Sequence, residues 1–143
     1  MTKVDFYILD DTQPLVRLGF ACRLAEKVWQ QGHQVYIHTA DATETQRMDE
    51  LLWTFRDGSF VPHQVIDNQA LDEETPIHIG HGEEPRHHDT VLINLTDTVP
   101  LFFSRFERVA EIIGGDEAHR ALGRDRFRFY KERGYPLEHH TIR

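Results

Sequence analysis

Residues 4–39, VDFYILDDTQPLVRLGFACRLAEKVWQQGHQVYIHT, decide the fold, because they contain the patterns of a strand, a helix and a second strand in direct succession. Val4 to Leu9 form a compact apolar and aromatic run closed by two aspartates, which is typical of a largely buried strand. Pro14 then opens a pattern in which apolar residues recur every three or four positions until Gly32. Gln34 to Thr39 form another apolar run. The stretch therefore predicts strand, helix and strand.

The rest of the chain continues this alternation. Asp41 and Glu44 form a D-x-x-E capping box, which opens a helix ending near Trp53. Strands are predicted at residues 77–79, 90–95 and 108–113, the last of these as the final strand, with a short helix at 100–106 and a helix from Asp116 to Gly134. The pattern predicts an α/β fold in one domain, residues 1–143, with a mostly parallel sheet and helices on both faces.

Composition narrows the function classes. The chain has a formal net charge of -8, which disfavours a generic nucleic-acid binder. It contains no apolar run near the roughly 20 residues that span a bilayer, so no membrane role is expected. The N-terminus lacks the features of a secretory signal, so a cytosolic location is expected. Cys22, the single cysteine, lies in an apolar helical pattern and is predicted to be a buried thiol.

Asp10 and Asp11 follow the first strand, where open α/β sheets bind ligands. Such a pair could hold Mg²⁺ and accept a phosphoryl group, so a small phosphoryl-transfer enzyme is one hypothesis. The site also needs a cation, commonly a lysine after a later strand. The lysines are Lys3, Lys27 and Lys131, and none follows a predicted strand. A solvated turn between strand and helix is the favoured interpretation.

Residues 78–89, HIGHGEEPRHHD, concentrate histidines and acids in a loop expected to be exposed. The group consists of His78, His81, His87 and His88 with Glu83, Glu84 and Asp89. Zinc or nickel could bind such groups, but the fixed frame of a metal site is missing, so we predict no metal and assign the loop no role. Phosphate-binding glycine motifs are also missing, which predicts no nucleotide cofactor.

Residues 120–133, RALGRDRFRFYKER, carry six of the sixteen basic residues and only two acids. On a helix, one face collects Arg120, Arg124, Phe127, Arg128 and Lys131. The opposite, core-facing stripe is predicted to be Ala118, Leu122 and Phe129. Cations around an exposed aromatic ring suit an acidic peptide that ends in a hydrophobic residue. A solvated face and direct binding of single-stranded nucleic acid remain the alternatives.

A second aromatic group lies in residues 51–63, LLWTFRDGSFVPH, around a turn. Its members are Trp53, Phe55, Phe60 and Val61. Such clusters are usually core, but large rings near a loop also fit an interface.

The order of several blocks resembles the chi subunit family of bacterial DNA polymerase III. The blocks are FYILDD, RMDELLW, SFVPH, DTVLINL and the C-terminal GRDRFRFYKERGY. The resemblance implies a Rossmann-like α/β fold with no nucleotide-binding loop and no catalytic activity or cofactor. It implies an adaptor in DNA replication, which links the psi subunit of the clamp loader to the acidic C-terminal tail of single-stranded-DNA-binding protein.

The resemblance also implies two binding surfaces. The tail site falls on Ile113, Arg120, Arg124, Phe127 and Arg128. The psi-binding surface falls on Trp53 and Phe60, where an accessory helicase is expected to compete.

Overall fold

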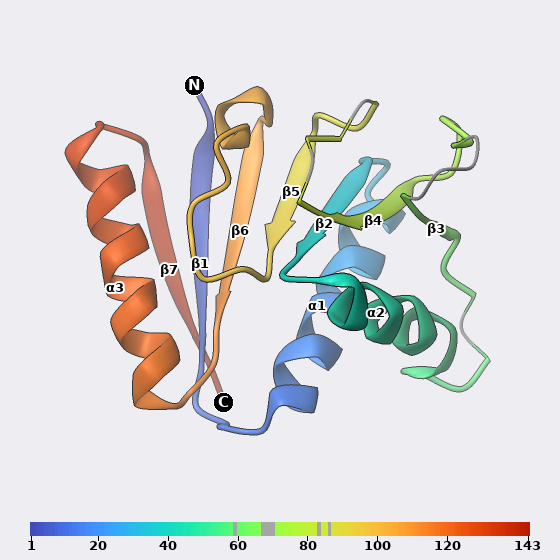
Figure 1. The fold of residues 1–143 in the computed structure, drawn as a ribbon, viewed down its shortest axis with the longest axis horizontal. Helices are drawn as coiled ribbons and strands as arrows, with labels where there is room; N and C mark the ends of the chain where they lie inside the picture. The colour runs from blue at the N-terminus through green and yellow to red at the C-terminus, as the bar shows by residue number, and fades with distance from the viewer. Residues whose placement is uncertain (59, 67–70, 83, 86) are drawn as a thin grey trace.

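The computed structural model describes residues 1–58, 60–66, 71–82, 84–85 and 87–143, which form a seven-stranded sheet flanked by helices (Figure 1). In chain order the elements are β1 (Lys3–Leu9), α1 (Pro14–Gln30), β2 (Val35–Thr39), α2 (Ala42–Thr54), β3 (His63–Val65), β4 (Ile77–His81), β5 (Val91–Asn94), the 3-10 turn η1 (Phe103–Arg105), β6 (Arg108–Ile113), α3 (Glu117–Glu132) and β7 (Leu137–Ile142).

The strand order in the sheet is β3-β4-β2-β5-β6-β1-β7. Every strand pair among the described residues is parallel. The predicted α/β class is therefore confirmed, and the sheet is all-parallel in the described part of the chain.

Helices cover both faces, as predicted. Helices α1 and α2 pack on one face, and α3 packs on the other together with the η1 segment (Figure 1). Residues of α1 and α2 such as Leu18 and Met48 share one apolar core with Ile37 and Ile112. On the opposite face, Tyr130 of α3 and Phe106 after η1 share a second core. Two cores with one sheet between them explain why the central strands are apolar on both faces.

Local signals in the sequence set the helix ends. Asp41 caps α2, since its Oδ1 accepts the backbone N–H of Glu44 at 2.9 Å, while Glu44 Oε1 accepts the N–H of Ala40 at 3.1 Å. Asp116 caps α3 by accepting the N–H of His119 at 3.2 Å. These contacts satisfy helix donors that lack partners within the helix.

Cys22 of α1 is buried, as predicted, and burial raises the pKa of its thiol to about 12. The thiol is therefore held in its neutral form. No helix in the described ranges has the length and apolar character needed to cross a membrane.

Three expectations were wrong. Arg108–Ile113 is not the final strand, because β7 follows α3 directly, and β3 was also missed. Strand β7 reads LEHHTI and is polar because it lies at the sheet edge, while β3 has only three residues. The helix predicted at residues 100–106 is the short turn η1. Of the predicted loop at residues 78–89, positions 83 and 86 lie outside the described residues.

Candidate functional site

Two glycines allow α3 to approach the sheet. A Cβ atom on Gly115 would lie 2.4 Å from the backbone oxygen of Asp10, and one on Gly123 would lie 2.9 Å from Cδ1 of Ile113. Both distances are shorter than a Cβ atom can approach a neighbouring atom without a clash, so a side chain at either position would force its neighbour to shift. The first half of α3 therefore lies directly against the carboxyl ends of β1 and β6.

The buried face of α3 differs from the predicted stripe. Its buried residues are Gly123, Arg126 and Tyr130. Ala118 is exposed, and Leu122 and Phe129 are only half-buried. Of the predicted core stripe, Phe129 does pack against the second core, so the prediction was right only in part. A pattern of apolar residues could not reveal this face, because a polar network fixes it.

That network surrounds Glu111 of β6, which is completely buried. Its carboxylate accepts hydrogen bonds from Arg126 Nε at 2.9 Å, from the Tyr130 hydroxyl at 2.7 Å and from Asn94 Nδ2 at 3.0 Å. Burial raises the pKa of Glu111, and the Arg126 guanidinium opposes that rise. Because removing either charged partner would leave the other buried and unpaired, the pair fixes the rotation of α3.

The rotation opens a groove of about 320 Å³ between α3 and the strands β6, β1 and β7. The residues that line it are Phe6, Ile8, Ile113, Arg120, Gly123, Arg124, Phe127 and His139. Four of the five residues predicted to form the tail site, Ile113, Arg120, Arg124 and Phe127, thus lie together. Arg128 does not line the groove. Its Nη2 atom lies 3.7 Å from Asp125 on the outer face of the helix, and both side chains are exposed.

Phe127 is half-buried, where an exposed ring was expected. Its ring meets that of Phe6 edge-on at a centroid distance of 5.2 Å. The ring therefore forms an apolar wall of the groove, and Phe6 and Ile8 contribute to its apolar lining.

The arginines of the groove have local partners. Arg120 Nε donates to the backbone oxygen of Gly115 at 3.0 Å. Arg124 Nη2 lies 2.6 Å from Glu117 Oε1, and both side chains are largely exposed. Such surface pairs contribute little to stability and exchange readily for another carboxylate. Arg124 is therefore available to an incoming anion.

Trp53 and Phe60, predicted as the second surface, lie near the β3 end of the sheet. Both side chains are exposed, and their ring centroids are 5.3 Å apart. Trp53 also contacts the buried ring of His63 at 4.2 Å. Trp53 and Phe60 therefore form an exposed aromatic patch that packs, through Trp53, on the buried ring of His63.

A buried arginine occupies the edge of the sheet where α/β folds bind ligands. Arg17 of α1 donates from Nη2 to the backbone oxygen of Leu95 at 2.6 Å and from Nε to that of Ile112 at 3.1 Å. These carbonyls lie at the carboxyl ends of β5 and β6, so a side chain of the protein already occupies part of this crevice.

Asp10 and Asp11, the candidate phosphoryl site, are both exposed. Asp11 Oδ1 accepts the backbone N–H of Gln13 at 2.8 Å, which is the contact of an Asx turn before a helix. Asp10 lies 3.9 Å from Arg143. These contacts are typical of a turn between strand and helix.

The histidine-rich segment is less exposed than predicted. His78 and His88 are buried and stack at 3.8 Å, and each donates from Nε2 to a backbone oxygen, of Asp72 at 3.0 Å and of Thr75 at 2.7 Å. Burial lowers the pKa of His78 to about 4. Glu83 of the same segment lies outside the described residues. The stacked pair is part of the packing.

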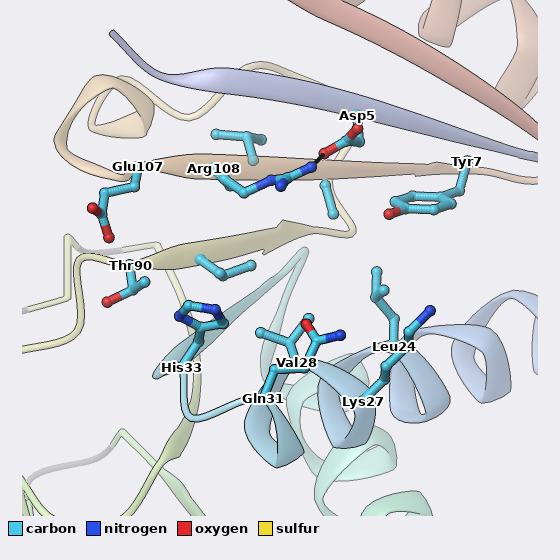
Figure 2. Close-up of a pocket in the computed structure, with 13 residues that line it drawn as sticks. Asp5, Tyr7, Leu24, Lys27, Val28, Gln31, His33, Thr90, Glu107 and Arg108 are labelled. Carbon is cyan, nitrogen blue, oxygen red and sulfur yellow. Dashed lines mark hydrogen bonds and ion pairs between the residues drawn. The ribbon is translucent and has the colours of Figure 1, made fainter.

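A second groove, of about 470 Å³, lies on the opposite face of the sheet beneath the end of α1 (Figure 2). The ion pair between Asp5 and Arg108, with 2.6 Å between Oδ2 and Nη2, lies in it and ties β1 to β6. Burial, followed by the charge of Asp5, raises the pKa of Tyr7 beside this pair. The ion pair explains an aspartate inside the apolar run of β1.

Asp5, Glu138 and His140 place ligand atoms within 4.8 Å of one another, and they are the group in the described ranges with metal-like spacing. Arg108 already pairs with Asp5, and Lys3 lies 3.2 Å from Glu138. Because these cations neutralise both carboxylates, the group is better explained as an ion-pair network than as a metal site.

The fold and the groove define an α/β protein with an arginine-lined, apolar groove beside its last helix. Its sequence matches the family model described as DNA polymerase III chi subunit, HolC, over residues 1–138. It is 47% identical to the DNA polymerase III subunit chi of Pseudomonas aeruginosa, over 99% of this chain and 98% of that one. It is 29% identical to the Haemophilus influenzae subunit chi, over 96% and 95%, and 26% identical to that of Escherichia coli, over 96% of each chain.

The chain therefore belongs to the DNA polymerase III chi subunit family, and as a subunit of this polymerase it has a role in DNA replication. The fold is also similar to that in the crystal structure of T4 UvsW, with a TM-score of 0.68 and 9% identity over 99% of this chain and 41% of that chain. At this identity the likeness shows the fold alone.

Sequence reasoning missed part of the groove. Phe6, Ile8 and His139 come from strands distant in sequence from α3, and no spacing pattern connects them to the helix. Gly123 was visible in the sequence, and its place inside a helix, where glycine is unfavourable, was the available signal.

Proposed function

We propose that this chi subunit is a non-catalytic adaptor whose groove beside α3 binds the acidic C-terminal tail of single-stranded-DNA-binding protein. The observation that carries the proposal is the meeting of Arg120 and Arg124 with Ile113 and Phe127 around one groove. Cations at the rim and apolar walls fit a ligand that carries carboxylates and ends in a hydrophobic residue.

The position of the groove on α3 adds to this complementarity. Arg120 lies at the end of the first turn of a helix that begins at Glu117, where the helix dipole favours negative charge. A short linear tail is expected to bind with micromolar affinity, about -8 kcal/mol. Several tails on one oligomer of the tail-bearing protein would raise the effective affinity further.

The second half of the proposal concerns Trp53 and Phe60. Exposed aromatic rings on a packed base are typical anchors of protein interfaces. We assign this patch to the psi subunit of the clamp loader, with an accessory helicase as a competing partner. The protein would then join the clamp loader to single-stranded-DNA-binding protein in the cytosol.

Calorimetry with a short synthetic peptide, rich in aspartate and ending in phenylalanine, tests the tail site. Arg124→Ala should weaken binding about ten- to a hundredfold, because a charge-assisted hydrogen bond contributes about 1.5–3 kcal/mol. Arg23→Ala, at an exposed arginine of α1 on the opposite face, is the matched control and should bind like wild type. Equal binding by Arg124→Ala and wild type would refute the site.

Direct binding of single-stranded DNA by α3 is the alternative. It relies on Phe127 stacking on a base, and half-burial against Phe6 leaves little of that ring free. The net charge of -8 also opposes it. A gel shift with naked single-stranded DNA at low salt separates the two, since a complex that weakens steeply with added salt would favour the alternative.

A further inference from the structure

Strand β7 leaves one edge of the sheet open. It is the last strand in the order β3-β4-β2-β5-β6-β1-β7, and in the described part of the chain its only partner strand is β1. At the other edge, β3 has three residues, whereas β7 has six. An open edge of this length presents unpaired backbone groups to any extended chain that approaches it.

The register shows which backbone groups of β7 are free. The N–H of Val4 donates to the oxygen of Pro136 at 2.9 Å, and that of Asp10 donates to the oxygen of Ile142 at 3.1 Å. Parallel pairing alternates along a strand, so the even-numbered residues of β7 bond to β1. The N–H and C=O groups of His139 and Thr141 therefore point away from β1, outward from the open edge of the sheet.

These free groups adjoin the groove beside α3. The side chain of His139 lines that groove, and Thr141 pairs in register with Ile8, which lines it too. His139 and Thr141 are both exposed, so α3 does not cover this half of β7. A chain whose last residue lies between Ile113 and Phe127 can leave the groove across His139 and reach the open edge within a few extended residues.

We propose that the acidic peptide binds by strand addition: its terminal residue fills the groove, and the residues before it pair with the free backbone groups of His139 and Thr141. The inference rests on the proposed function and specifies how the peptide is held. Backbone pairing supplies affinity and orientation, while Arg120 and Arg124 select negative side chains on the face toward α3. Charge complementarity with these arginines identifies an acidic peptide as the occupant.

Thr141→Pro is the discriminating variant. Proline lacks the N–H group, and at an edge position whose N–H faces solvent it is compatible with a strand. Thr141→Val is the matched control, because it keeps the N–H and the branched side chain. With the aspartate-rich peptide ending in phenylalanine, Thr141→Pro should bind about tenfold more weakly than Thr141→Val, while Thr141→Val binds like wild type.

Two measurements on the wild-type protein keep the test independent of the folding of the proline variant. A peptide that is methylated on a backbone nitrogen expected to pair with β7 should bind about tenfold more weakly than the unmodified peptide. The backbone amide hydrogen of Thr141 should exchange with solvent more slowly when the unmodified peptide is bound.

Equal affinity of Thr141→Pro and Thr141→Val, with unchanged exchange at Thr141, would overturn strand addition. If Arg124→Ala still lost affinity in that case, the tail site itself would stand. If the wild-type protein does not bind the peptide, both strand addition and the proposed tail site would be overturned.

Discussion

His78 and His88 are buried with their rings stacked, and both use Nε2 to donate to a backbone oxygen. Burial lowers the pKa of His78 to about 4 and also lowers that of His88. The unfolded chain takes up these protons below about pH 6.5. The folded chain does not until the pH approaches the lowered values. Stability is therefore fully present above about pH 6.5 and is lost as the pH falls from there.

We expect the free energy of unfolding to fall between about pH 7.5 and about pH 5.5, by up to about 1.4 kcal/mol per pH unit for each buried histidine. Urea denaturation at both pH values measures this. His78→Gln removes one titrating group and keeps an N–H near the position of Nε2, so the fall should become smaller. An unchanged pH dependence in this variant would show that His78 is not responsible.

At the level of single residues, helical spacing predicted part of the groove. The predicted face also included Arg128 and Lys131, which do not line it. Arg120, Arg124 and Phe127 share the groove because they are separated by three or four positions. The same spacing did not show that Phe127 is half-buried, since that depends on the ring of Phe6, which β1 places beneath α3 on the same face of the sheet.

The orientation of α3 was predicted incorrectly because a buried polar network, and not an apolar stripe, determines which face of the helix meets the sheet. Apolar periodicity assigned its buried face to Ala118, Leu122 and Phe129, but the carboxylate of Glu111 instead draws Arg126 and Tyr130 inward. A buried ion pair between a strand and a helix leaves no periodic signal in the sequence. Strand β7 was missed for a related reason, because an edge strand has little apolar surface to bury.

Gly123→Ala tests the close contact between α3 and β6. Replacing glycine inside a helix gains about 1 kcal/mol of helix propensity, while overpacking against Ile113 costs about 1–3 kcal/mol. We expect a net destabilisation of about 0–2 kcal/mol and weaker peptide binding, because Ile113 must move within the groove.

Gly19→Ala is the matched control for this prediction. The nearest atom to a Cβ on Gly19 is Nη1 of Arg23, at 3.8 Å, so there is room for the methyl group. This change in α1 should stabilise the protein by about 0.5–1 kcal/mol and leave peptide binding unchanged. Equal effects of both substitutions in urea denaturation and calorimetry would contradict a special contact at Gly123.

On the scale of the whole molecule, the two proposed surfaces lie at opposite ends of the sheet. Figure 1 shows α3 beside β7 and β1 at one end, and α2 near β4 and β3 at the other. Neighbouring strands are about 4.8 Å apart, so the surfaces are separated by on the order of 20 Å. The chain as a whole has a net charge of -8, which repels DNA and leaves the groove as a local cationic site.

This separation predicts independent binding. Trp53→Ala should abolish capture of the psi subunit in a pull-down and leave the affinity for the acidic peptide within about twofold of wild type, because sites this far apart couple by less than about 0.5 kcal/mol. Arg124→Ala should do the reverse. The double variant should show both the loss of psi capture and the loss of affinity for the acidic peptide.

If Trp53→Ala weakened peptide binding as much as Arg124→Ala does, while its unfolding in urea matched wild type, the two ends of the sheet would have to be linked. The adaptor would then act as a switch that senses one partner through the other.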